Sequence, residues 1–173
     1  GGKDSMSGTF NDIDVPPTLV SFAVDIAKQQ DIVTPELKKA GNQLVLFEID
    51  KDDFDIPMYE AVGELYDQIH ELAVAGKICS AYALDSKGIA AAVSKMAFGN
   101  RLGVKLNADV AAEKLFENGL GNILAEVAPE TIAELNDKEI EYTVVGTVTE
   151  EPSFVWGDVT ISMEEALKAW TSK

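Results

Sequence analysis

The sequence has few of the residues that bind transition metals or form disulfides. Its 173 residues include one cysteine, Cys79, and one histidine, His70. A single cysteine excludes an internal disulfide, and a single histidine excludes a histidine-rich metal site. Cys79 lies in an apolar run without a basic neighbour, which favours a small buried hydrophobe over a thiolate nucleophile. His70 follows the apolar stripe of a predicted helix, which favours a boundary position over a catalytic base.

Basic residues are also scarce. The chain has 14 Lys and Arg against 30 Asp and Glu, a net charge of −16, which argues against nucleic acid or an anionic membrane as a partner. No apolar run is long enough to span a bilayer and no secretory signal is evident, so we expect a cytoplasmic protein. The charge is unevenly spread: residues 77–114 have a local basic excess, six residues against three, and an anionic small molecule would bind most favourably there.

The remaining composition is typical of a folded protein. Hydrophobic residues make up 46% and charged residues 25%, and the length suits one globular domain. Apolar runs predict strands at residues 19–24, 44–49, 78–84, 104–106, 123–127 and 142–148. A hairpin is predicted from residues 154–156 and 159–161, around Gly157 and Asp158.

Helices are expected between these strands. Helical spacing and stop signals predict them at residues 35–39, 58–75, 89–98, 109–118 and 129–136. A last helix should begin at Ser162, which forms a capping box with Glu165. The turn between the last two strands is too short for a parallel crossover, so the sheet should be mixed. The predicted fold class is α/β with α+β character, a mixed β-sheet packed with helices.

The first residues are the most distinctive feature. Gly1 and Gly2 allow the backbone to curl, and Lys3, Asp4 and Ser5 then supply a cation, a carboxylate and a hydroxyl. Such a loop suits a phosphate and its metal, and its position at the very start indicates a piece of a longer protein. The alternative is a cloning remnant with a frayed terminus.

A second candidate lies inside the chain, at residues 85–88. Asp85, Ser86, Lys87 and Gly88 fall between a predicted buried strand and a helix N-terminus, where backbone N–H groups favour an anion. The alternative is that Ser86 only caps the helix and Gly88 only permits close packing. The many carboxylates single out no acid/base pair, and the aspartates of residues 50–57 lack the glycine of a calcium loop, so a solvated acidic loop is favoured there.

Three stretches carry a family resemblance. They are Gly-Gly-Lys-Asp-Ser-Met-Ser at residues 1–7, Thr-Pro-Glu-Leu-Lys-Lys-Ala-Gly-Asn-Gln-Leu at residues 34–44, and residues 90–105 with Lys-Met-Ala-Phe-Gly-Asn at their centre. In these stretches, and in their order, the chain resembles the phosphoribosylformylglycinamidine synthase family. The resemblance covers nearly the whole chain.

The resemblance implies a domain organisation and a reaction. Members of the family are duplicated, aminoimidazole-ribotide-synthetase-like proteins with two A-type and two B-type lobes and a glutaminase domain. Residues 1–14 would be the terminal loop of the preceding A lobe, and residues 15–173 the B-type C-terminal lobe. The implied ligase uses ATP and Mg²⁺ to activate formylglycinamide ribonucleotide, and ammonia from glutamine completes the amidine of purine biosynthesis. The isolated lobe would be inactive, and its partners would be the other lobes.

The resemblance also implies roles for the candidate residues. Gly2, Lys3, Asp4 and Ser5 would bind nucleotide or substrate, with Lys3 on a phosphate and Asp4 near the metal or a substrate hydroxyl. Ser86 and Gly88 complete the candidate set. Many relatives carry His-Asp, any residue, then Ser-Asp-Gly-Gly at that loop, whereas this chain reads Ala-Leu-Asp-Ser-Lys-Gly-Ile at residues 83–89.

That departure supports an alternative, a non-catalytic structural or docking lobe of the same enzyme. A further alternative is a lobe of another ATP-dependent synthetase of the superfamily, such as a selenophosphate synthetase or a thiamine-phosphate kinase. The sequence Gly-Gly-Lys-Asp-Ser-Met at residues 1–6 favours the phosphoribosylformylglycinamidine synthase family over these other synthetases.

Overall fold

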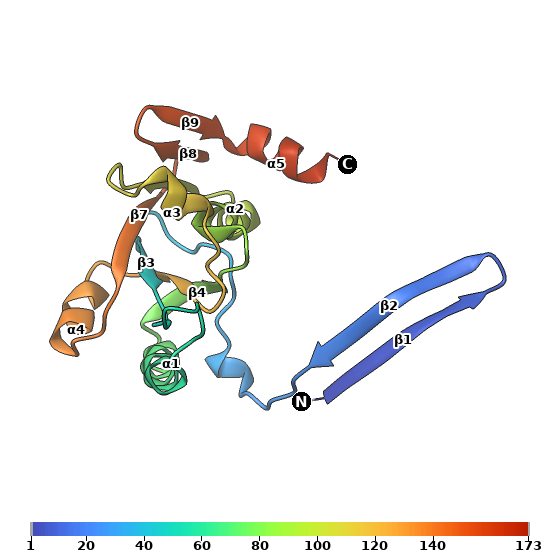
Figure 1. The fold of residues 1–173 in the computed structure, drawn as a ribbon. Helices are drawn as coiled ribbons and strands as arrows, with labels where there is room; N and C mark the ends of the chain where they lie inside the picture. The colour runs from blue at the N-terminus through green and yellow to red at the C-terminus, as the bar shows by residue number, and fades with distance from the viewer. Residues whose placement is uncertain (1, 173) are drawn as a thin grey trace. The chain divides into compact units, whose positions relative to one another are not determined.

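The computed structural model describes residues 2–172 and divides the chain into two compact units, Gly1–Ile32 and Val33–Lys173. Figure 1 shows the order of their elements along the chain. None of the helices in the described part is long and apolar enough to cross a membrane.

The first unit is an antiparallel hairpin. It consists of β1 (Gly2–Phe10) and β2 (Ile13–Phe22), joined by a turn in which Asn11 has a φ of 53°, and a short 3-10 helix, η1 (Gln29–Asp31), follows. The curled loop expected at the first residues is therefore not found, because residues 2–10 form a strand. Pro16 and Pro17 are accommodated because the pairing passes from Met6↔Thr18 to Gly8↔Val15 and skips them.

The predicted strand at residues 19–24 is found only in part and is exposed. Residues 19–22 belong to β2, and Leu19 is 70% exposed. The apolar side chains of β2 are exposed because a two-stranded ribbon has no second layer within its own unit to cover them.

The second unit contains a seven-stranded sheet in the order β4-β6-β3-β7-β5-β8-β9. Its strands are β3 (Gln43–Phe47), β4 (Ile78–Ala83), β5 (Gly103–Leu106), β6 (Ile123–Val127), β7 (Thr143–Thr149), β8 (Ser153–Trp156) and β9 (Val159–Ser162). Strands β5 and β8 are parallel and the other neighbours antiparallel. The predicted mixed sheet is confirmed.

Helices cover both faces of this sheet. They are α1 (Tyr59–Val74), α2 (Gly88–Asn100), α3 (Ala112–Phe116), α4 (Thr131–Asp137) and α5 (Met163–Thr171). Alternate residues of the central strand β3 enter two cores: Leu44 and Leu46 pack with α2 and α3, while Val45 and Phe47 pack with α1 and α4. In Figure 1, α1 and α2 accordingly lie on opposite sides of β3. The continuous apolar run of β3 is explained by burial on both faces.

Two helix predictions are corrected. Residues 35–39 form no helix, because the N–H groups of Lys38 and Lys39 donate to the carboxylate of Glu126 instead of to preceding carbonyls. The helix predicted at residues 109–118 is confined to Ala112–Phe116, with Ala111 at its N-cap. The predicted N-cap of the last helix is confirmed, since the N–H of Glu165 donates to Ser162 Oγ at 3.2 Å.

Candidate functional site

The loop at residues 85–88 joins β4 to α2, as the sequence predicts, and Gly88 is its sterically critical residue. Gly88 is buried with a φ of +69°, in the left-handed region that favours glycine. A Cβ there would lie 2.5 Å from the carbonyl oxygen of Glu117 and 2.8 Å from that of Leu115. The close-packing interpretation of Gly88 is therefore correct.

Asp85 organises this loop. Its Oδ1 accepts the N–H of Lys87 at 2.8 Å, and its carbonyl accepts the N–H of Gly88 at 3.2 Å and that of Gly119 at 3.3 Å. Two of the N–H groups that the sequence analysis assigned to an anion are thus already bonded to Asp85. Ser86 is exposed, and α2 has Lys87 at its N-cap without a side-chain cap, so the capping interpretation of Ser86 is wrong.

Lys95 of α2 connects the loop to the sheet through hydrogen bonds to a residue of each. Its Nζ donates to Asp85 Oδ2 at 2.9 Å and to the hydroxyl of Tyr82 at 2.8 Å. The Tyr82 hydrogen bond, then the one to Asp85, raises the pKa of Lys95, and the Lys95 hydrogen bond lowers the pKa of Asp85. The Lys95 ammonium also lies 5.7 Å from the ring centroid of Trp170.

A groove of about 770 Å³ begins at this loop. Its floor is one face of α2, where Ala90, Ser94 and Phe98 follow at four-residue spacing, and α5 contributes Trp170. Ser94 Oγ is bonded to the Ala90 carbonyl at 2.8 Å, which leaves the groove largely apolar. No local sequence pattern predicts this groove, because α2 and α5 are far apart in the chain.

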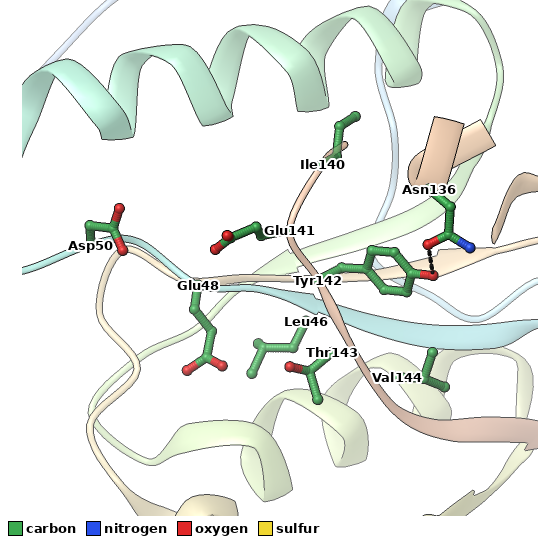
Figure 2. Close-up of a pocket in the computed structure, with 9 residues that line it drawn as sticks. All are labelled: Leu46, Glu48, Asp50, Asn136, Ile140, Glu141, Tyr142, Thr143 and Val144. Atoms are coloured by element: carbon green, nitrogen blue, oxygen red, sulfur yellow. Dashed lines mark hydrogen bonds between the residues drawn. The ribbon is translucent and has the colours of Figure 1, made fainter. Parts of the chain in front are cut away.

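A second cavity, of about 690 Å³, lies beside the central strand and is shown in Figure 2. Glu48, Asp50 and Glu141 line it, and Tyr142 donates to Asn136 Oδ1 at 2.9 Å. Three carboxylates and no lysine or arginine in the lining disfavour a phosphate there. Among residues 2–172, no cluster of three His, Cys, Asp or Glu could hold a metal ion.

The residues of the first candidate site lie in β1. Gly2, Lys3, Asp4 and Ser5 are exposed, and Asp4 Oδ1 accepts the N–H of Ser5 at 2.8 Å. Successive side chains of a strand project to opposite faces, so Lys3 and Asp4 point away from each other in this conformation. One carboxylate suits Mg²⁺ that is bound mainly through nucleotide phosphates, but not a cage made by this chain. These residues and Ser86 with Gly88 belong to different units.

The comparisons with known proteins concern the fold. No model of a known protein family matches the sequence. The chain is similar to the structure of Thermotoga maritima PurL complexed with AMPPCP, with a TM-score of 0.65 and 16% identity over 81% of this chain and 28% of that one. A T. maritima PurL complexed with FGAR gives a TM-score of 0.64 at 15% identity, over 80% of this chain and 30% of that one.

A more distant likeness is to Escherichia coli HypE, a hydrogenase maturation protein, with a TM-score of 0.57 and 11% identity over 78% of this chain and 52% of that one. The T. maritima protein is phosphoribosylformylglycinamidine synthase II. The chain spans less than a third of the PurL structures that it matches, and at these identities the likeness concerns the fold alone. The mixed sheet and its helices therefore have the fold of part of phosphoribosylformylglycinamidine synthase II, in agreement with the resemblance in the sequence.

Proposed function

We propose that this chain is the B-type C-terminal lobe of the second synthetase repeat of an ATP-dependent, glutamine-dependent amidine-forming ligase of purine biosynthesis. The observation that carries the proposal is the agreement of two independent features. The fold is that of PurL over 81% of the chain, and the sequence carries the family's stretches at residues 1–7, 34–44 and 90–105.

In the proposed function, residues 2–5 act with other lobes. Lys3 supplies a cation for a phosphate, and the free oxygen of Asp4 contributes to a magnesium ion held mainly by nucleotide phosphates. Magnesium and ATP together supply the activation of the amide oxygen. The chain alone offers one carboxylate for this task in β1, so the remaining contacts must come from the nucleotide, the ribonucleotide substrate and the neighbouring lobes.

The loop at residues 85–88 has a supporting role in this proposal. The Asp85 carboxylate accepts a hydrogen bond from the N–H of Lys87, and the Asp85 carbonyl accepts one from the N–H of Gly88. Lys95 forms an ion pair with the same carboxylate. This arrangement favours the structural or docking alternative for the B-type lobe itself. Ser86 then lies on the surface and Gly88 permits close packing beneath it, and neither binds a nucleotide.

Calorimetric titration of the 173-residue chain with ATP and Mg²⁺ tests the dependence on other lobes. We expect no saturable binding at micromolar nucleotide, since the phosphate contacts would be incomplete. Saturable micromolar binding by this chain alone would contradict the requirement for a partner lobe.

Substitutions in the intact enzyme test the assignment of residues 2–5. Lys3→Ala and Asp4→Asn should each lower the rate of amidine formation by at least ~100-fold, as loss of a preorganised charge does in other enzymes. Lys28→Ala and Asp12→Asn are matched controls, exposed in the same unit but outside the family stretch. Unchanged turnover in both test variants would favour a purely structural lobe.

A further inference from the structure

The segment that leads from β3 into α1 exposes several apolar side chains in a row. Phe54 is 84% exposed and Tyr59 is 76% exposed, and Ile56 and Met58 are half-exposed. Residues 50–64, called the acidic segment here, also contain six acidic residues and a single basic one. Apolar side chains exposed singly are normal, but several of them in one short segment point to an interaction site.

Hydrogen bonds within the acidic segment hold these side chains in place. Asp52 Oδ1 accepts the N–H groups of Phe54 and Ile56, each at 2.9 Å. The N–H of Asp52 donates to the carbonyl of Ile56 at 2.9 Å, and the N–H of Met58 donates to the carbonyl of Asp50 at 2.9 Å. The loop is therefore ordered by its own bonds, so a partner that binds it would lose little free energy in ordering it.

A groove of about 660 Å³ is lined by this loop and by the first turns of α1. Its apolar lining comes from Ile56, Met58 and Tyr59, and its acidic lining includes Glu60 and Glu64. Among the described residues that line it there is no lysine or arginine. The groove thus combines apolar surface with uncompensated negative charge, and it has room for the apolar side chains of a partner.

The charge around the groove determines which partner chemistry fits. The basic residue of the acidic segment, Lys51, forms an ion pair with Asp55 at 3.0 Å. On the other side, Glu64 also lines a neighbouring hollow with Glu48 and Glu141. Such a concentration of carboxylates attracts cations and repels anionic lipid or nucleic acid. A peptide segment with apolar side chains flanked by lysine or arginine matches both the groove and its charge.

We infer that the acidic segment is a docking surface for a basic amphipathic segment of another protein. Phe54 and Tyr59 are its aromatic anchors, and anchors of this kind supply much of the binding energy of an interface. The partner's apolar side chains lie in the groove, and its lysines or arginines face Glu60 and Glu64. The inference does not depend on the proposed function, which gives residues 50–64 no role.

Fluorescence anisotropy of the 173-residue chain with a labelled leucine–lysine peptide, patterned as an amphipathic helix, tests the inference. We expect a Kd of about 10 µM or tighter, and no comparable binding of the matching leucine–glutamate peptide. Phe54→Ala should weaken binding at least ~10-fold. Phe116→Ala is the matched control, because Phe116 is also exposed but lies in α3, and its affinity should stay within about twofold of wild type. Equal affinities in the two variants would show non-specific attraction to the net charge and would overturn the inference.

Charge-matched variants test the acidic side of the same surface. Asp53→Asn with Glu60→Gln removes two exposed charges from the acidic segment, and Asp158→Asn with Glu164→Gln removes two exposed charges elsewhere in the unit. The first pair should weaken peptide binding about 5-fold and the second by less than about twofold. Equal losses in the two pairs would refute the inference. Binding of the chain to phosphatidylglycerol vesicles would refute it as well, because it would identify a membrane as the partner.

Discussion

Similar apolar residues are exposed in the first unit and buried in the second. In the hairpin, Phe10 is 74% exposed, whereas Phe47 of β3 in the second unit is completely buried. Both lie in strands that alternate side chains between two faces, but only the second unit has helices on both faces of its sheet. The comparison teaches that an apolar run specifies a strand, while burial depends on whether another layer is present to cover it.

The largest expected difference in folding stability is between two phenylalanine truncations, one in each unit. Phe47→Ala should lower the free energy of unfolding of the second unit by about 3–5 kcal/mol, because it removes a packed ring from the core. Phe10→Ala should change it by less than about 0.5 kcal/mol. Urea unfolding followed by tryptophan fluorescence measures this, since Trp156 and Trp170 both belong to the second unit. Equal effects would contradict the division into units.

A glycine pair sharpens the same contrast between covered and open positions. Gly88→Ala should cost about 2–4 kcal/mol, because its Cβ meets backbone carbonyls and the φ is positive. Gly76→Ala is the matched control, with a φ of +71° and no heavy atom within 4 Å of its Cβ, and should cost only about 1 kcal/mol. Urea midpoints distinguish the two, and equal losses at Gly76 and Gly88 would show that backbone strain, which the two positions share, outweighs packing.

Substitution of Ser162 and Ser86 tests which serine stabilises a helix N-terminus, that of α5 or that of α2. Ser162→Ala should cost about 1 kcal/mol, because Ser162 caps α5. Ser86→Ala should leave the free energy of unfolding within about 0.5 kcal/mol of wild type, because the N-terminus of α2 has no side-chain cap. Thermal unfolding measured by circular dichroism suffices for both variants. A cost at Ser86 as large as at Ser162 would restore the capping interpretation.

The smallest expected effect is the loss of folding stability at low pH. The hydrogen bond from Lys38, and then that from Thr34, lower the pKa of Glu36 from 4.5 to about 2, and the hydrogen bond from Lys77 lowers that of Glu134. A lowered folded-state pKa gives stabilisation that is present above the unfolded value and is lost as the pH falls through the folded one. Both carboxylates are partly exposed to solvent, which screens these interactions, so the loss of stability below about pH 4.5 should be slight. A carboxyl NMR titration should place the Glu36 midpoint near pH 2, and Lys38→Ala should return it toward 4.5.

The sequence predicted well those elements whose signals are local. The spacing of apolar residues located α1, and the strand at residues 123–127 was found with its bounds. It failed at residues 35–39, where Thr34 and Pro35 favour a helix start but distant Glu126 takes the N–H groups. A charged residue within an apolar run expected to be buried was the signal that could have identified Glu126.

The candidate sites show the same limit. The loop at residues 85–88 was located correctly, but its bonding to Lys95 and Gly119 joins residues that are separated in the chain. Likewise, Glu48 and Glu141 meet in one cavity although almost a hundred positions lie between them, so no spacing rule could pair them.

The sequence by itself determined where strands and helices form, because periodicity, turn residues and capping boxes act over a few neighbouring positions. Only the tertiary structure decided which apolar strands are covered and which donors surround Glu126. Burial and hydrogen-bond partners are properties of segments brought together by folding, and a buried carboxylate is stable only where several such segments supply its donors at once.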